Sequence, residues 1–204
     1  MSLDLHVSSV VDSLFDFLER APAAILLLDG QRRVVYANSE ATAATARNDG
    51  ICLAGGTFAL LRQQDDARFQ ELIVRALGAG HAPPSAMRAT RAPGRRPYAI
   101  VVTRLSAHLA VPERMRPALC VVISDPDTRR DVPVDRLQAL FGLTEAEGRL
   151  AALLACGDDL KSAARTLDIT YGTARARLAE VFSKTDTRRQ GELVNLVLTT
   201  LAIV

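Results

Sequence analysis

Several residue types are scarce in this chain of 204 residues, which has no tryptophan, only 4% aromatic residues and three cysteines. The cysteines, Cys52, Cys120 and Cys156, lie far apart and are odd in number, so neither a disulfide framework nor a zinc cluster is expected. Phosphate-binding loops and nucleophile elbows are absent as well. We therefore expect no catalysis, no metal and no resident cofactor, with reduced thiols typical of a cytoplasmic protein.

Long apolar runs are also lacking. The first residues, Met1–Asp4, carry no basic charge and no long apolar run follows them, so no signal peptide is expected. The apolar stretch Leu193–Val204 is shorter than the roughly 20 residues that a bilayer requires. With 49% hydrophobic and 24% charged residues, the composition is typical of one or two globular domains and indicates no membrane partner.

The last third of the sequence contains the start signals of successive helices. Thr144 and Glu147 match a capping box, and Gly157 suits the end of the helix that they begin. Asp159 and Thr170 suit the starts of two further helices that are separated by a short turn. This order predicts a helix-turn-helix. The inner face of its last helix is formed by Ala174, Leu178, Val181 and Phe182.

The helix after Thr170 carries most of the excess positive charge. Between Thr173 and Arg189, five basic residues stand against two acids, whereas the whole chain has a net charge of only +2. A local basic stripe suits a helix that lies among the phosphates of a DNA major groove, where arginine can also pair with a guanine edge. The candidate DNA-binding residues are Thr173, Arg175, Ala176, Arg177, Ala179 and Lys184.

This stretch resembles the DNA-binding domain of LuxR-type transcriptional regulators. The matching residues are Leu143, Thr144, Glu147, Gly157, Ala164, Leu167, Ile169, Thr173, Leu178, Phe182–Thr185 and Glu192–Val194. The resemblance implies an all-α four-helix domain whose third helix, residues 171–184, enters the major groove and whose fourth helix helps to pair two subunits. It also implies that Arg175, Ala176 and Ala179 face bases, and that Thr173, Arg177 and Lys184 approach the DNA backbone. The chain departs from the family at Arg177, where histidine is common.

The first part of the chain shows a different pattern. Residues 1–20 have the apolar spacing of a short helix, which is either a lid on its own domain or a dimer contact. The segments after it predict an α+β domain with one antiparallel sheet. They are strands Ala24–Leu28 and Arg33–Tyr36 around the Asp29–Gly30 turn, a helix Ser39–Arg47, an irregular stretch Gly50–Leu61, a helix Asp66–Leu77, and strands near Ala86–Thr90, Tyr98–Leu105 and Ala118–Ser124.

This order resembles a PAS sensor domain over about residues 21–125. The match rests on the hairpin Leu26–Gly30, on Val34–Asn38 and on the closing strands. The resemblance implies a pocket for a small ligand between the sheet and the helical middle, and dimers that form through flanking helices. The identity of such a ligand is unknown.

Other sensor types do not match. A phosphorylation receiver needs a lysine, but none precedes Lys161. An acyl-homoserine-lactone domain is longer and relies on aromatic residues including tryptophan, whereas this chain has no tryptophan and only 4% aromatic residues. The flavin photosensor motif is absent around Cys52, and haem ligation by His81 or His108 is not favoured because both lie in or near predicted loops. A second basic cluster, Arg88, Arg91, Arg95 and Arg96, is interpreted as a solvated hairpin tip in preference to a phosphate site.

Together these patterns predict four segments: an N-terminal helix 1–20, a PAS-like domain 21–125, a linker 126–137 and a helix-turn-helix domain 138–204. The leading hypothesis is a dimeric transcription regulator that binds double-stranded DNA and responds to a small-molecule or protein signal. The alternative is a protein-interaction module, because the charges from Asp135 onward balance at nine of each sign. A sigma-factor-like region is disfavoured by the fourth helix.

Overall fold

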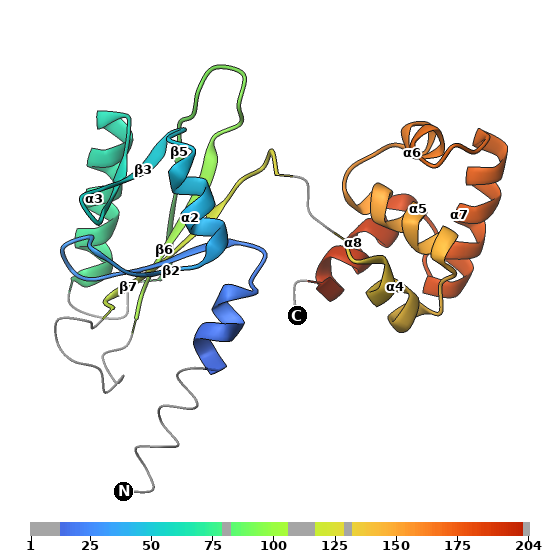
Figure 1. Cartoon of the computed structure of the whole chain (residues 1–204), viewed down its shortest axis with the longest axis horizontal. Coiled ribbons are helices and arrows are strands. Elements are labelled where there is room, and N and C mark those ends of the chain that lie inside the picture. The colour runs from blue at the N-terminus through green and yellow to red at the C-terminus, as the bar shows by residue number, and fades with distance from the viewer. Residues whose placement is uncertain (1–12, 79–82, 106–116, 129–131, 202–204) are drawn as a thin grey trace, which may run out of the picture. The chain divides into compact units, whose positions relative to one another are not determined.

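The computed structural model describes residues 13–78, 83–105, 117–128 and 132–201 (Figure 1). The chain divides into two compact units, Met1–Thr128 and Arg129–Val204. The expected fold class, an α+β PAS-like domain followed by an all-α helix-turn-helix domain, is confirmed. Within the described residues, no helix has both the length and the apolar character needed to cross a membrane.

The first unit is built on a five-stranded antiparallel sheet with the strand order β2-β1-β7-β6-β5. The strands are β1 (Ala24–Leu28), β2 (Val34–Ala37), β5 (Ser85–Ala89), β6 (Tyr98–Arg104) and β7 (Leu119–Ser124). Every residue of β1 is buried, as its continuous apolar sequence predicts. Strands β6 and β7 alternate between buried and more exposed residues, so each contributes one face to the core.

Two helices, α2 (Ser39–Ala46) and α3 (Gln63–Leu77), contribute to this core together with Ile51, Phe58 and Leu60. The rings of Phe58 and Phe69 meet edge to face with their centroids 5.3 Å apart, beside Leu72 and Ile73 of α3. Burial of this apolar surface against the sheet is the main source of stability for the unit.

Asn38 connects three parts of the first unit. Its Oδ1 atom accepts from the amides of Ile25, at 2.9 Å, and Ala41, at 3.0 Å, so it caps α2 and holds β1. Its Nδ2 atom donates to the carbonyls of Leu18 and Ala23. Asn38 is fully buried, and these four hydrogen bonds satisfy its amide completely.

The stretch Gly50–Leu61, expected to be irregular, is instead a two-stranded hairpin. Its strands, β3 (Ile51–Ala54) and β4 (Thr57–Leu60), pair with Ile51 opposite Leu60. Gly55 and Gly56 both have positive φ, which matches the two-residue turn that suits twisted antiparallel strands. The prediction was wrong because the strands are short, and their apolar residues become recognisable only when Phe58 and Leu60 pack into the core.

The described residues of the second unit form five helices, the four of the expected domain and a short one before them. They are α4 (Val134–Phe141), α5 (Glu145–Ala155), α6 (Leu160–Thr166), α7 (Tyr171–Thr185) and α8 (Gln190–Leu201). Helix α4 begins inside the expected linker 126–137, because Leu137 is buried in the core of this unit. Gly148 of α5 leaves room for α4, since a Cβ atom at Gly148 would lie 2.8 Å from Cγ1 of Val134.

The predicted helix starts are confirmed. Thr144 and Glu147 form the complete capping box of α5, Asp159 accepts from the amide of Ser162, and Thr170 accepts from the amide of Thr173. Between α6 and α7 the chain turns within a few residues, with Asp168 in the left-handed conformation. Local side-chain to backbone hydrogen bonds therefore set the ends of the helix-turn-helix.

Candidate nucleic-acid interface

Helix α7 buries one face and exposes the other, as the sequence predicts. Ala174, Leu178 and Val181 are buried, and Leu178 and Val181 belong to the core shared with α5 and α8. Thr173, Arg175, Ala176 and Ala179 are exposed, and Arg177 is half-buried. The candidate residues therefore lie mainly on the solvent side of the helix, with Arg177 turned partly inward.

The two arginines of α7 do not share a face. Residues two positions apart on an α-helix are separated by about 200° around its axis, so Arg175 and Arg177 lie at opposite edges of the exposed surface. Between them the surface carries the exposed residues Ala176, Ala179 and Glu180. The exposed face of α7 therefore has one guanidinium at each edge, with Ala176 and Ala179 between them.

Thr173 and Lys184 are engaged within the unit. The hydroxyl groups of Thr170 and Thr173 lie 2.8 Å apart, at the start of α7. The Nζ atom of Lys184 donates to Oε2 of Glu147 at 2.7 Å. The amine of Lys184, which was expected to approach the DNA backbone, therefore already binds a carboxylate of α5.

Glu147 is the partner that the sequence reasoning assigned only to the capping box. Its side chain is 11% exposed, and the hydrogen bond from Lys184, followed by those from Thr144, holds the pKa of this carboxyl below its ordinary value of 4.5. Glu147 thus connects the first turn of α5 to the last turn of α7, 37 residues further along the chain.

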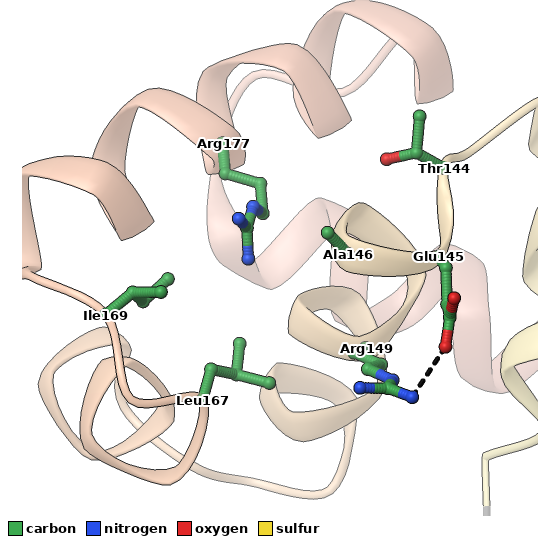
Figure 2. A pocket seen from close by; sticks show the side chains of 7 residues that line it. All are labelled: Thr144, Glu145, Ala146, Arg149, Leu167, Ile169 and Arg177. Carbon is green, nitrogen blue, oxygen red and sulfur yellow. Dashed lines mark hydrogen bonds and ion pairs between the residues drawn. The ribbon is translucent and has the colours of Figure 1, made fainter.

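A hollow of about 390 Å³ lies between the start of α5, the turn before α7 and α7 itself (Figure 2). It is lined by Thr144, Glu145, Ala146, Arg149, Leu167, Ile169 and Arg177. Arg149 was not among the candidate residues. Arg149 follows the capping box on a helix that was expected to serve the core, so the sequence gives no signal for it. Only the fold brings Arg149 to the same hollow as Arg177.

Helix α8 buries Leu193 and Val197 within the second unit, whereas Val194, Leu196 and Leu198 are only half-buried. Much of the apolar surface of α8, which suggested a contact with a second subunit, is thus buried inside the unit. Subunit pairing through this helix stays a prediction.

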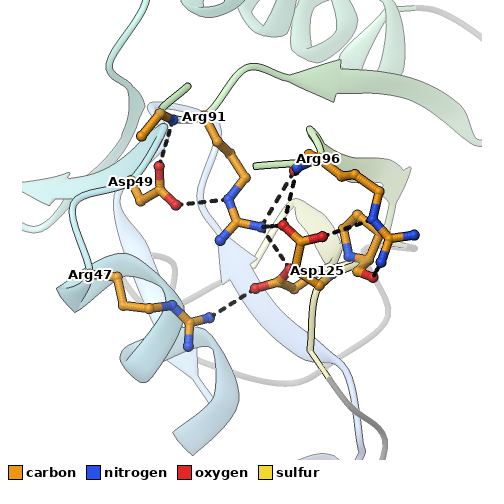
Figure 3. Close-up of polar contacts among 8 residues, drawn as sticks. Arg47, Asp49, Arg91, Arg96 and Asp125 are labelled. Carbon is orange, nitrogen blue, oxygen red and sulfur yellow. Dashed lines mark hydrogen bonds and ion pairs between the residues drawn. The ribbon is translucent and has the colours of Figure 1, made fainter. Parts of the chain in front are cut away.

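The basic cluster of the first unit is a solvated tip only in part, because Arg88 and Arg95 are exposed whereas Arg91 is buried. Figure 3 shows Arg91 among acidic side chains: its Nε atom lies 2.9 Å from Asp49, and its Nη1 atom lies 2.7 Å from Asp125 and 3.3 Å from Asp127. The Arg91 side chain is 1% exposed, and its guanidinium stacks over the Tyr98 ring at 4.1 Å. The interpretation as a hairpin tip was wrong for Arg91, because acids distant in sequence surround it.

Arg96 reinforces this cluster. Its Nε atom lies 2.7 Å from Oδ1 of Asp127, and its guanidinium also donates to the Pro126 carbonyl. The hydrogen bond from the Arg96 side chain holds the pKa of Asp127 below its ordinary value. Residues 126 and 127, the expected start of the linker, are therefore bound to the first unit. The three aspartates Asp49, Asp125 and Asp127 outnumber Arg91 and Arg96 by one charge, and Arg47, whose guanidinium lies 3.5 Å from Asp125, balances it.

Three residues were disfavoured as cofactor ligands, and the structure describes one of them. Cys52 lies on β3 and is half-buried, while His81 and His108 lie outside the described residues. In the core, the hydroxyl of Tyr98 is buried and has no hydrogen-bond partner among the described residues. Its ring fills the space between Arg91 and the apolar residues of the sheet.

No family model matches the chain, and no curated protein sequence is similar to it. Solved structures with some likeness include the complex of phage VqmA with DPO, at 19% identity over 95% of this chain and 88% of that chain, with a TM-score of 0.39. The Vibrio cholera VqmA–ligand–DNA complex has 18% identity, covers 92% and 86%, and has a TM-score of 0.34.

A Rhodobacter sphaeroides LOV protein has 18% identity over 83% of this chain and 92% of that chain, with a TM-score of 0.34. At these identities and scores, the function has to be inferred from the residues of this chain.

Proposed function

We propose that this chain is a LuxR-type transcription regulator that binds double-stranded DNA through α7, with the PAS-like first unit as the sensor that modulates it. The observation that carries the proposal is the exposed face of α7. It presents small residues, Ala176 and Ala179, between an arginine at each edge. A helix of this shape can approach the floor of a major groove while its edges reach the two flanking phosphate strands.

The helix-turn-helix geometry supports the same function. Helix α6 and the short turn at Asp168 precede α7, and Thr170 stabilises the first turn of α7. Residues near the start of such a second helix are those that reach base edges. Arg175 and Ala176 occupy this position. Arg175 is therefore the best candidate for a base or phosphate contact on its edge.

A homodimer is part of the proposal. One exposed helix face with an arginine at each edge makes few contacts, and two copies on half-sites about one helical turn apart would supply the affinity that one lacks. A small-molecule or protein signal at the first unit would act by favouring the arrangement of subunits that it binds better. We propose no catalytic role for either unit.

The alternative, a protein-interaction module, is favoured by one observation. Glu180 is exposed on the same side of α7, and Lys184 is paired with Glu147, so acids offset part of the positive stripe. A partner protein with mixed charges would fit this face, whereas DNA would be repelled by Glu180 unless a cytosine amino group faced it.

Gel retardation with genomic DNA fragments tests the proposal. Wild-type protein should retard a subset of fragments in a salt-dependent manner. The double substitution Arg175→Ala and Arg177→Ala should abolish retardation while circular dichroism shows an unchanged helix content. Retardation that persists in the double variant would exclude α7 as the DNA-binding element.

A further inference from the structure

The hollow beside α7 contains two arginines from different helices. Arg149 comes from α5 and Arg177 from α7, and Figure 2 shows both side chains at the rim of the same space. Leu167 and Ile169 add apolar atoms to its lining. Two guanidinium groups that line one hollow beside apolar side chains suit an anion with several acceptor oxygens.

The charges around this space favour an anion. The acid that lines it is Glu145, whose Oε1 atom lies 2.5 Å from Nη2 of Arg149. Both side chains of this pair are about 60% exposed, so solvent screens their attraction and an incoming anion can compete with it. Among the described residues, none accepts a hydrogen bond from the Arg177 guanidinium.

The start of α5 adds a donor at the same place. The Thr144 hydroxyl accepts from the Glu147 amide at 3.3 Å, which leaves its own proton available to an acceptor in the hollow. Helix α5 also directs its positive end toward this side. Thr144 therefore supports a site that the two arginines define.

The position of the hollow indicates which anion it takes. Arg177 lies at one edge of the exposed face of α7, and the hollow continues from that edge onto α5. When a helix lies in a major groove, its edges are the parts nearest to the phosphates of the flanking strands. A phosphate on the Arg177 side would face the hollow directly.

We propose that this hollow binds one phosphodiester group of the DNA backbone, held between the guanidinium groups of Arg149 and Arg177. The proposal rests on the proposed function, and it adds α5 to the DNA-binding surface. It assigns Arg177 to the backbone together with Arg149, and leaves Arg175 at the opposite edge. Glu145 is then a competitor that occupies Arg149 in the free protein.

Fluorescence anisotropy of the full chain with a labelled random-sequence duplex, over a series of salt concentrations, tests this site. Arg149→Ala and Arg177→Ala should each weaken binding. The double variant should lower the slope of log affinity against log salt by about 0.9, the value for one phosphate, and not by twice that amount. Glu145→Gln should tighten binding by about twofold, because it releases Arg149.

Arg136→Ala is the matched control, because Arg136 is an exposed arginine on α4, away from the hollow. It should bind like wild type. The shared site is excluded if Arg149→Ala binds DNA as tightly as this control. It is also excluded if the affinity losses of Arg149→Ala and Arg177→Ala simply multiply in the double variant. DNA binding by α7 stands in either case. If the wild-type chain binds no duplex, the proposed function and this site are both excluded.

Discussion

Lys184 and Glu147 form an ion pair with a separation of 2.7 Å between Nζ and Oε2, and the same carboxylate oxygen accepts from the Thr144 amide at 2.7 Å. One side chain therefore holds the end of α7 against the beginning of α5. Because the proposed DNA-binding face is on α7, this pair sets the orientation of that face relative to the rest of the second unit.

Replacing Glu147 with glutamine should destabilise the second unit by about 1 to 2 kcal/mol, through loss of the charge-assisted capping bond and of the pair with Lys184. Differential scanning calorimetry would measure the change. Glu145→Gln serves as control, because Glu145 is exposed and its pair with Arg149 contributes little. Equal stability of the two variants would show that the Lys184 pair does not contribute.

Stability should depend on pH through the same carboxyl. The pKa of Glu147 in the folded chain is lowered from 4.5, so its contribution is complete above that value and is lost as the pH falls through the lower folded value. Urea titrations between neutral and acidic pH should show this loss in wild type. Glu147→Gln should show a smaller decline, and identical declines would contradict the assignment.

Arg91 should be the most sensitive charged residue of the first unit. Arg91→Met would leave the carboxylates of Asp49, Asp125 and Asp127 close together without their shared partner, at a cost of about 3 kcal/mol in the free energy of unfolding. Calorimetry of the first-unit transition measures this. Arg95 is exposed in the same segment, so Arg95→Met should change the free energy of unfolding little. An equally small change for Arg91→Met would refute the buried cluster.

A substitution at Tyr98 should raise the stability of the first unit. Its hydroxyl is buried without a hydrogen-bond partner among the described residues, and an unsatisfied buried hydroxyl costs free energy. Tyr98→Phe keeps the ring under Arg91 and should raise stability by about 1 kcal/mol. Denaturation by urea would measure this gain in stability. A loss of stability would mean that the hydroxyl has a partner, such as a bound ligand.

The features that could be predicted from sequence depend on nearby residues. The capping residues Thr144, Asp159 and Thr170 bond to amides three positions on, and their helices begin as expected. The apolar run of β1 likewise indicates a central strand. These signals need no knowledge of the rest of the fold.

The features that could not be predicted depend on residues far apart in the chain. Arg91 is buried because Asp49 and Asp125, 42 and 34 residues away, approach it. Lys184 meets Glu147 across 37 residues, and Arg149 and Arg177 line one hollow only after α5 and α7 have packed. Charge patterns along the sequence give no information on such pairings.

The exposed face of α7 is tested most directly by Ala176→Glu. Ala176 is exposed on this helix, so the substitution should leave the fold intact while placing a carboxylate where phosphates and bases are expected. Ala139→Glu is the matched control at an exposed position of α4. Anisotropy with labelled duplex DNA should show affinity reduced more than about tenfold for Ala176→Glu, since a misplaced charge at an interface costs several kcal/mol, and wild-type affinity for Ala139→Glu. Equal affinities of the two variants would contradict DNA binding by this helix.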